Sequence, residues 1–371
     1  MERQNSMKTP LHVTLRRLFR TYLYILLGKL LKSGETKNTI DKKEIKTIVI
    51  IRPNYRIGNL IFLTPLINEI HKNMPDVKID MIVGMKIAGD IFKPMPNIDR
   101  VIDIPRSLLV HPIELYKFIR DARRKRYDLA INIISGSISS QIVTILTNAK
   151  YKASGTSEHN ITKLTHTIVE EALYRHSGQQ TLEFLKLFDI PLPKENAFLD
   201  IKLTQDEIET AKEELQDLLQ KANLPQKSKV VALFRNARLD KKIQDEWWQA
   251  WHEEFLKLDK EIVIVDILSP DILSKLNNNC LEYSNKNLRA LGAFFQACSI
   301  YVSADTGPMH LACASQANTL ALFNKTDILT YGTLGDANKT IDINDMTPKE
   351  VAKASYDYLQ NSISKNNVPG A

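Results

Sequence analysis

The segment Val302–Ala314, VSADTGPMHLACA, places a strand, a polar turn and a helix in immediate succession. The strand ends at Ser303, the helix starts near Pro308, and the turn between them carries Asp305. Free backbone N–H groups and the positive dipole end at a helix start suit a phosphate or pyrophosphate. A carboxylate in the turn can accept hydrogen bonds from sugar hydroxyls. The segment therefore predicts a strand–turn–helix unit with a phosphorylated sugar ligand, or else a turn that only caps its helix.

Three other residues of this turn fit the same ligand. Thr306 and Gly307 allow a close approach of the ligand to the backbone, and His310 is a candidate donor to phosphate. A single histidine inside such a helix is often only a hydrogen-bonding core residue, so both interpretations of His310 stay open.

A second strand-to-helix segment, Ile48–Pro65, reads IVIIRPNYRIGNLIFLTP. Its strand runs into a basic loop with Arg52 and Arg56, and Gly58 then permits a tight turn or the close approach of a ligand. Sheets of this class expose their sites at the carboxyl ends of their strands. The loop lacks the GxGxxG spacing of dinucleotide-binding folds, which argues against an NAD-dependent enzyme. The alternative to a binding loop is a solvated basic loop.

A third segment, Val230–Lys242, reads VVALFRNARLDKK and again leads a strand into a basic loop. Arg235, Arg238, Lys241 and Lys242 stand before the next predicted helix. Several cations at such a position suit the diphosphate of a leaving group. A charged surface loop would have the same composition.

Strands alternate with helices through both halves of the chain. The first half has expected strands at 47–51, 78–83, 100–104 and 129–134, and expected helices at 59–73, 88–93 and 114–124. The second half has expected strands at 230–234, 262–266, 300–303 and 319–323, and expected helices at 206–222, 244–258, 288–297, 309–315 and 348–360. This alternation predicts parallel sheets. The expected fold is therefore α/β, with two facing Rossmann-like, doubly wound domains and a ligand between the carboxyl ends of their sheets.

The boundary between the halves is predicted from the segment 190–203, IPLPKENAFLDIKL, which contains two prolines and no helical period. The last helix is expected to begin with Thr347 as its N-cap and Glu350 at the third position. The predicted organisation is an extension at 1–45, a first domain at 46–190, a linker at 191–203, a second domain at 204–345, and a C-terminal helix and tail at 346–371.

The extension contains a basic amphipathic pattern at residues 11–32, LHVTLRRLFRTYLYILLGKLLK. Its longest uncharged stretch is far shorter than the roughly 20 residues that span a bilayer, and no small-residue cleavage site follows. One interpretation is an interfacial helix on an anionic cytoplasmic leaflet. The other is a helix packed on the domain or on another subunit. Apolar side chains recur at helical spacing at Leu11, Leu15, Leu18, Tyr22 and Ile25.

The composition narrows the class of partner. The net charge of +7 fits nucleic acid, an anionic membrane or a phosphorylated substrate. There is no zinc-finger spacing and no aromatic RNA-binding strand, so no nucleic-acid partner is expected. Cys280, Cys298 and Cys313 lack the spacing of a metal or redox site, so no metal is expected either.

Two motifs together resemble glycosyltransferase family 9, the ADP-heptose:lipopolysaccharide heptosyltransferases and their relatives. They are R-x-G-[DN]-L-x-x-x-T-P after the first strand and S-x-D-T-G-P-M-H-L-A far downstream, within a match over about residues 46–362. The resemblance implies a GT-B fold, an ADP-sugar donor bound mainly by the second domain, and a lipid-anchored core-oligosaccharide acceptor bound by the first. It also implies inverting transfer without a metal or cofactor, by an enzyme on the inner face of the inner membrane.

The resemblance assigns roles to positions that match the motifs. Lys241 or Lys242 resembles the lysine that meets the donor diphosphate, although Phe234–Asn236 replaces the usual glycine-containing loop. The predicted acceptor-binding residues are Arg52, Arg56 and Gly58. The predicted donor-binding residues are Arg235, Lys241, Lys242, Asp305, Thr306, Gly307, Pro308, Met309 and His310.

Asn59 is the main departure from the family pattern. The family usually has an aspartate there, which is the expected general base, and an amide cannot take up a proton as a carboxylate can. Either another group is the base, or Asn59 only positions the acceptor, or activity is weak or lost. Asp103, Glu158 and His159 are the candidates for another base. A non-catalytic protein that binds sugar nucleotides or core oligosaccharide is the corresponding alternative function.

Overall fold

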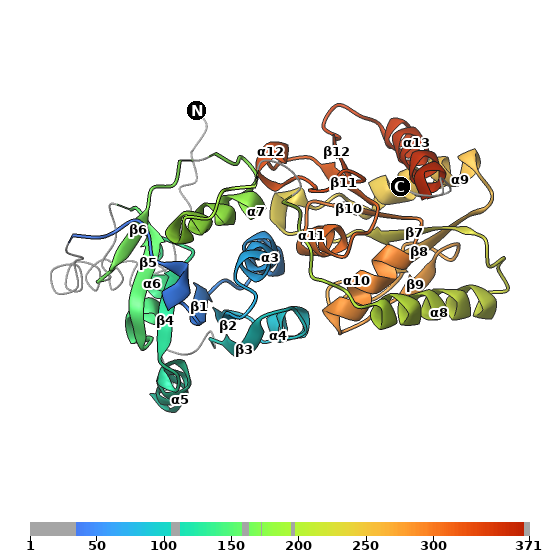
Figure 1. Cartoon of the computed structure of the whole chain (residues 1–371). Coiled ribbons are helices and arrows are strands. Elements are labelled where there is room, and N and C mark those ends of the chain that lie inside the picture. The colour runs from blue at the N-terminus through green and yellow to red at the C-terminus, as the bar shows by residue number, and fades with distance from the viewer. Residues whose placement is uncertain (1–34, 105–111, 158–162, 172, 194–196, 367–371) are drawn as a thin grey trace, which may run out of the picture.

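The computed structural model describes residues 35–104, 112–157, 163–171, 173–193 and 197–366, which form two α/β domains side by side (Figure 1). The predicted amphipathic helix at 11–32 lies outside the described residues, as do the base candidates Glu158 and His159.

The first domain is built on a six-stranded sheet in which all neighbouring strands are parallel. The strand order is β3-β2-β1-β4-β5-β6, so the direction of winding reverses between β1 and β4. Four consecutive residues of β1 are fully buried, because helices cover both faces of the sheet. The strands are β1 (Thr47–Arg52), β2 (Lys78–Val83), β3 (Ile98–Asp103), β4 (Tyr127–Asn132), β5 (Ala149–Gly155) and β6 (His166–Ile168).

The second domain repeats this topology. Its sheet order is β12-β11-β10-β7-β8-β9, again parallel throughout, and it reverses between β7 and β10. Counted within each domain, both sheets have the order 3-2-1-4-5-6, which confirms the two doubly wound domains. The strands are β7 (Lys229–Phe234), β8 (Ile262–Ile267), β9 (Leu281–Tyr283), β10 (Ile300–Ala304), β11 (Thr319–Phe323) and β12 (Lys339–Asp342).

Helices cover both sheets. In the first domain the helical segments are η1 (Lys42–Glu44), α2 (Ile57–Ile61), α3 (Thr64–Asn73), α4 (Ala88–Phe92), α5 (Pro112–Arg123), α6 (Ile138–Leu146), α7 (Ser177–Gln180) and η2 (Thr181–Phe188). In the second domain they are α8 (Gln205–Lys221), η3 (Leu239–Lys241), α9 (Asp245–Leu258), α10 (Leu288–Ala297), α11 (Gly307–Ala314), α12 (Ile328–Tyr331) and α13 (Pro348–Asn366). None of those described contains an apolar stretch long enough to cross a membrane.

The structure divides one predicted helix into two and confirms the predicted start of another. The single helix expected at 59–73 is two helices, because Pro65 stands in the first turn of α3 and has no N–H to continue the hydrogen-bond ladder of α2. The predicted start of α13 is confirmed. Thr347 accepts from the backbone N–H of Glu350, and the Glu350 carboxylate accepts from the backbone N–H of Thr347.

The domains are joined by a segment that is hydrogen-bonded to both of them. The backbone N–H of Asp200 donates to Thr64 of the first domain, and Asn68 donates to the Asp200 carbonyl. The next residue, Ile201, donates its N–H to the Ala314 carbonyl of the second domain. One cluster of buried apolar side chains runs from the first sheet to the second, so the two domains are packed directly against each other.

Candidate active site at the domain junction

The predicted site residues come from the strands at which each sheet changes direction. The segment after β1 supplies the first-domain residues, and the segments after β7 and β10 supply the second-domain residues. A crevice outside the carboxyl ends of such strands is where doubly wound sheets bind ligands. The topology therefore brings together motifs that are far apart in the sequence.

The closest contact between the two motifs is made by glycines. A Cβ atom on Gly58 of α2 would lie 2.7 Å from the Cδ2 atom of His310 in α11. A Cβ atom on Gly307 of α11 would lie 2.5 Å from the Cγ2 atom of Ile57 in α2. Either distance is a steric overlap, so the two helices approach this closely only because both positions are glycine. Gly58 thus lies against the second domain and not against open space.

Asp305 and Lys241 form an ion pair at the start of α11. The Nζ atom of Lys241 lies 2.6 Å from the Oδ2 atom of Asp305, and the Asp305 side chain is only 7% exposed. Their strands, β7 and β10, are neighbours in the sheet, which explains how residues so far apart in sequence meet. Lys241 keeps 33% of its side chain exposed, so its ammonium group is also accessible from outside.

The first turn of α11 has no side-chain cap. Thr306 is the N-cap residue in an extended conformation and makes no capping hydrogen bond with its side chain. Pro308 occupies the first turn, where it has no N–H to leave unpaired, and Met309 is fully buried beneath the turn. Because Asp305 bonds to Lys241 instead of capping the helix, the backbone N–H groups of the turn keep the character of an anion site.

A buried aromatic cluster lies behind this turn. His310 packs edge-on against Phe62 of the first domain, with 4.6 Å between ring centroids, and Phe62 also contacts His176. Burial, together with the neighbouring His176 and Lys241, lowers the pKa of His310 to about 3. His310 is therefore a neutral imidazole, whose Nδ1 atom has no hydrogen-bond partner among the described residues.

His176 connects the two domains within the same cluster. Its Nε2 atom lies 3.0 Å from the Gly332 carbonyl of the second domain, and its Nδ1 atom accepts from the backbone N–H of Gly178. This pattern requires the proton on Nε2. Burial lowers the pKa of His176 to about 4, although the bond to Gly332 opposes the shift. Sequence reasoning missed this residue, because no motif surrounds it.

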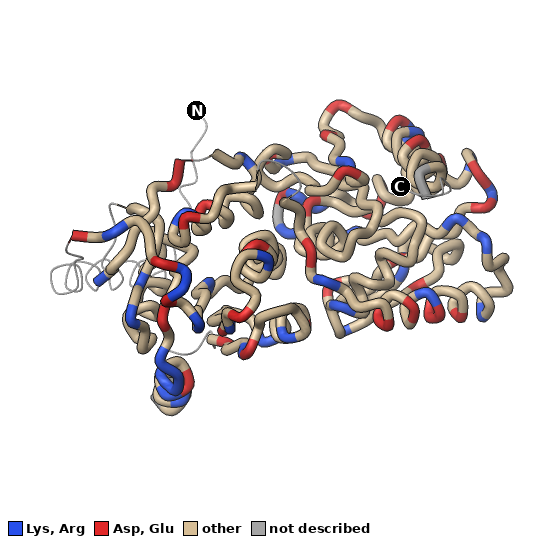
Figure 2. The backbone as a smooth tube through the Cα atoms, viewed as in Figure 1, with Lys and Arg blue, Asp and Glu red and all other residues tan. Residues whose placement is uncertain are grey.

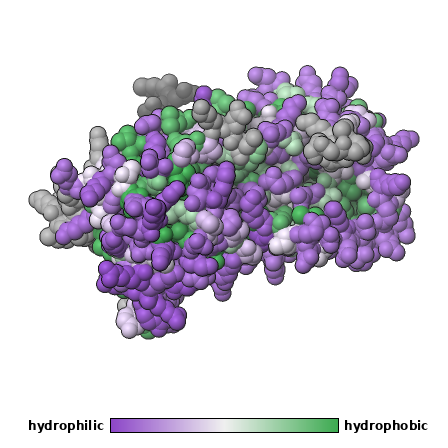
Figure 3. Space-filling view, viewed as in Figure 1, coloured by the Kyte–Doolittle hydropathy of each residue, from purple (hydrophilic) through white to green (hydrophobic). Residues whose placement is uncertain are grey.

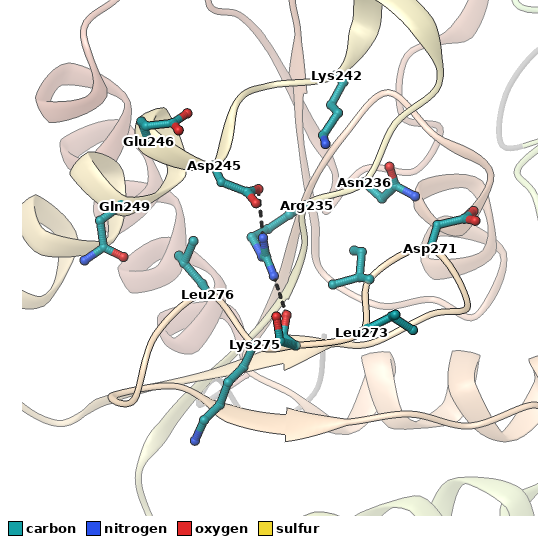
Figure 4. Close-up of a pocket in the computed structure, with 12 residues that line it drawn as sticks. Arg235, Asn236, Lys242, Asp245, Glu246, Gln249, Asp271, Leu273, Lys275 and Leu276 are labelled. Atoms are coloured by element: carbon teal, nitrogen blue, oxygen red, sulfur yellow. Dashed lines mark hydrogen bonds and ion pairs between the residues drawn. The ribbon is translucent and has the colours of Figure 1, made fainter.

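Arg235 is a bracing residue in the structure. Its guanidinium donates to Asp266 at 2.9 Å, and the residue is 5% exposed. It also donates to Asp245 at 2.8 Å and to the Ser274 carbonyl at 2.9 Å (Figure 4). These bonds hold the end of β7 to the start of α9 and to the segment after β8. Each of the three guanidinium nitrogens of Arg235 thus donates a hydrogen bond within the protein, so the predicted role of Arg235 in donor binding would have to be added to these bonds.

A pocket of about 590 Å³ opens beside Arg235 at the carboxyl ends of β7 and β8 (Figure 4). That volume falls in the range of small-molecule sites. Lys242 reaches this pocket, whereas Lys241 turns to Asp305. The segment 271–276, which forms one wall, carries no motif by which sequence reasoning could have found it. The other lining residues include Asn236, Asp245, Glu246 and Gln249.

The first-domain candidates surround α2. Arg52 ends β1 partly buried, and burial lowers its pKa to about 10, while Tyr331 of α12 acts in the opposite direction. Arg56 is exposed at the N-cap of α2. Asn59 is half-buried in α2, and its side chain makes no hydrogen bond within the described part of the chain. Asp103 is exposed at the end of edge strand β3, two strands and thus about 10 Å from β1.

No group of three or more His, Cys, Asp or Glu side chains among the described residues is arranged to hold a metal ion.

Sequence comparison identifies relatives over most of the chain. A profile described as glycosyltransferase family 9 (heptosyltransferase) matches residues 115–358. Lipopolysaccharide heptosyltransferase 1 of Campylobacter coli is 25% identical over 322 residues, covering 80% of this chain and 89% of that protein.

Solved structures share the fold. A glycosyltransferase family 9 protein from Veillonella parvula superimposes with a TM-score of 0.70 at 16% identity, covering 85% of this chain and 97% of that one. The E. coli heptosyltransferase WaaC, solved with ADP, gives a TM-score of 0.66 at 19% identity, covering 85% and 99%. Both have the two-domain architecture described above.

Proposed function

The chain belongs to glycosyltransferase family 9, and on that premise we propose that it transfers heptose, or a related sugar, from an ADP-sugar to a lipopolysaccharide or lipooligosaccharide core. Transfer of a glycosyl group is the activity of the family. The ADP-heptose donor, the inversion of the anomeric centre and the absence of a metal or cofactor are parts of the proposal. We take residues 46–190 as the acceptor domain and 204–345 as the donor domain.

The Lys241–Asp305 pair at the uncapped start of α11 is the observation that carries the proposal. In the proposed complex the donor diphosphate lies at the N–H groups of Thr306 and Gly307, and Lys241 balances the negative charge that develops as the diphosphate leaves. Asp305 accepts from hydroxyl groups of the sugar. Lys242 and the pocket beside Arg235 bind the nucleoside part of the donor.

The acceptor in this proposal approaches from the first domain, along Arg52, Arg56 and Asn59. Its hydroxyl group attacks the anomeric carbon as the bond to the diphosphate oxygen breaks, and its proton passes to a base. Asn59 orients the hydroxyl through its amide but does not take the proton. Asp103 is the described base candidate, and its place on an edge strand would require domain or loop movement to bring it to the acceptor.

The first experiment is nucleotide binding measured by thermal shift with ADP, UDP and GDP. We expect ADP to raise the melting temperature, because a ligand at 100 times its Kd adds about 2.7 kcal/mol to the unfolding free energy. Asp305→Asn should weaken this shift. Asp240→Asn removes the same charge from an exposed neighbour of Lys241 and is the matched control. Stabilisation by UDP or GDP but not ADP would rule out the ADP-sugar.

Asn59 supports a second candidate function, a protein that binds sugar nucleotide or core oligosaccharide without turnover. Release of ADP from ADP-heptose in the presence of a core acceptor separates the two. Donor binding without release over many hours would favour the binding protein.

We further propose that the enzyme works on the cytoplasmic face of the inner membrane, held there in part by residues 1–32. The basic amphipathic pattern of that segment and a lipid-anchored acceptor support this location.

A further inference from the structure

α5 presents one face to the first sheet and the opposite face to solvent. Phe118 and Ala122, one helical turn apart, are buried in the apolar cluster that also contains Val49 and Ile51 of β1. On the other side of the helix, Ile113 is 69% exposed and Tyr116 is 67% exposed. Among the large apolar side chains of the described residues, only Leu273 is more exposed than these two.

The same exposed face continues as a row of cations. Lys117, Arg120 and Arg123 follow Ile113 and Tyr116 at three- and four-residue steps, which keeps all of them on one side of the helix. Arg124 follows directly, and all four cations are exposed. Figure 2 shows these basic residues gathered on α5 at the edge of the first domain, and Figure 3 shows the strongly hydrophilic surface there.

These cations differ from the nearby Lys125 in how they are paired. Lys125 turns inward to Asp99 and to the buried Asp80. Among the described residues, Arg120 pairs with the adjacent Asp121 at the surface, and 60% of its own side chain is exposed. The outward charge of the face is therefore positive and open to an external anion.

We propose that this α5 face, formed by Ile113, Tyr116, Lys117, Arg120, Arg123 and Arg124, docks on an anionic lipid bilayer. Tyrosine and aliphatic side chains enter the headgroup region of a membrane, and lysine and arginine next to them pair with anionic headgroups. An acidic protein or a nucleic acid would match the cations alone. The exposed apolar end of the face favours the bilayer.

The direction of α5 supports this inference. The helix ends at Arg123 and β4 begins at Tyr127, so its C-terminal end lies at the amino edge of the sheet. Ile113 and Tyr116, near the opposite end, therefore point toward the carboxyl edge, where the candidate site lies. This step rests on the proposed function, because an enzyme with a lipid-anchored acceptor needs its acceptor side close to the bilayer.

The direct test is an environment-sensitive fluorophore on Tyr116→Cys in the full-length chain. The native Cys280, Cys298 and Cys313 are buried, so the label goes to the new thiol. Glu213→Cys on α8, exposed on the second domain, is the matched control. On vesicles of phosphatidylcholine and phosphatidylglycerol at about three to one, we expect a blue shift from position 116 and none from 213. An unshifted label at 116 on a vesicle-bound chain would overturn the proposal, because the chain would then bind through another segment such as residues 1–32. A chain that does not bind the vesicles at all would also overturn it.

Charge removal gives a second, independent measurement. Arg120→Gln with Arg123→Gln should weaken vesicle binding about fivefold for each cation removed. Lys212→Gln with Lys221→Gln removes the same charge from the exposed face of α8 and should have little effect. Equal losses in the two pairs would mean that only net charge matters, and the α5 face would not be the docking surface.

A water-soluble acceptor separates this proposal from the proposed function. Sugar transfer to an acceptor without its lipid should be the same in the α5 variants and the unmodified chain, because the substituted side chains lie on the solvent face of α5 and are not among the predicted site residues. If the unmodified chain transfers no sugar, the proposed function fails, whereas the vesicle result still decides the role of α5.

Discussion

Asn59 lies half-buried in α2, the helix that touches α11, and carries an amide where the family resemblance expects a carboxylate. An amide can orient a hydroxyl group by accepting through its oxygen or donating through its nitrogen, but it cannot act as the base. A role for Asn59 at the reaction centre stays a prediction, and the chemistry of the side chain limits any such role to positioning.

Substitutions at Asn59 test this limit. Asn59→Ala should lower turnover by loss of orientation. Asn59→Asp should keep or raise turnover, because a missing base typically costs about 10²- to 10⁴-fold in rate. Steady-state release of ADP with donor and acceptor measures both. If Asn59→Ala has no effect, the residue is structural. If Asn59→Asp abolishes turnover while ADP still binds, the chemistry differs from that of the family.

The buried histidines predict a pH-dependent stability. Burial lowers the pKa of His176 to about 4 and of His310 to about 3, whereas both titrate near 6.5 in the unfolded chain. Their contribution is complete above about pH 6.5. Below this pH, the unfolded chain binds protons that the buried histidines of the folded chain do not. The free energy of unfolding therefore falls by up to about 1.4 kcal/mol per pH unit for each histidine, until the pH reaches the pKa of the folded state.

His176→Gln should make this pH dependence shallower. Glutamine can still donate to the Gly332 carbonyl but does not titrate in this range. Denaturant unfolding at pH 7.5, 6 and 5 would compare the slopes of the variant and the unmodified chain. Parallel slopes would mean that the pKa of His176 is the same in the folded and the unfolded chain.

At the scale of single residues, the sequence predicted which charged residues take part in interactions better than it predicted their partners. Asp305 and Lys241 were both expected in the site, but nothing in their segments predicts that they pair with each other. Arg235 was expected to bind the donor, and its bonds to Asp245 and Asp266 could not be predicted, although it also lines the pocket. Charged loops look alike in sequence, because the partner of each charge is set by the packing of distant strands.

At the scale of elements, the contact between α2 and α11 is the feature on which the site depends. Each helix follows a central strand of its own sheet, and the two meet backbone to backbone at Gly58 and Gly307. Each glycine was explained from the sequence by its local turn or by a ligand, whereas the structure adds a partner in the other domain. Contacts between segments of different domains leave no periodicity in either segment.

Alanine at either glycine should disturb this contact. Gly58→Ala places a methyl group against His310, and Gly307→Ala places one against Ile57, at distances that force the helices apart. We expect a lower melting temperature, by several degrees, and a loss of transfer activity in both variants. Gly136→Ala is the control, because a Cβ atom there has nothing within 4 Å. If all three variants resemble the unmodified chain, the domains do not need this close approach.

The strands differ in how well the sequence predicts them. Buried apolar strands such as β1, β7 and β11 were predicted to within a residue, because burial on both faces requires unbroken apolar runs. The edge strands β9 and β12 were not predicted, since they are short and only partly buried. β5, with lysines at alternate positions, also lacks such a run.

At the scale of the whole molecule, the duplicated strand order agrees with the fold expected from the alternation of strands and helices. The linker was predicted at 191–203 from its prolines and its lack of a helical period. Its hydrogen bonds to Thr64 on one side and Ala314 on the other could not be inferred, because they depend on how the domains pack.

Removal of residues 1–32 should reduce binding of the chain to anionic vesicles. The segment carries an excess of basic residues on an amphipathic pattern, so added salt should weaken binding of the full chain in the same way. Vesicle co-sedimentation at low and high salt measures both effects. If the full chain does not bind anionic vesicles at low salt, the segment instead packs on the domain or on another subunit.

Each sheet is made from one continuous stretch of chain, since β1–β6 all precede β7–β12 and α13 packs on α9 within the second domain. No strand of the first sheet comes from a segment after β6. During synthesis the first domain can therefore fold while the second is still being made. The Gly58–Gly307 contact then forms last, so the junction that carries the site is assembled only when translation of the second domain is nearly complete.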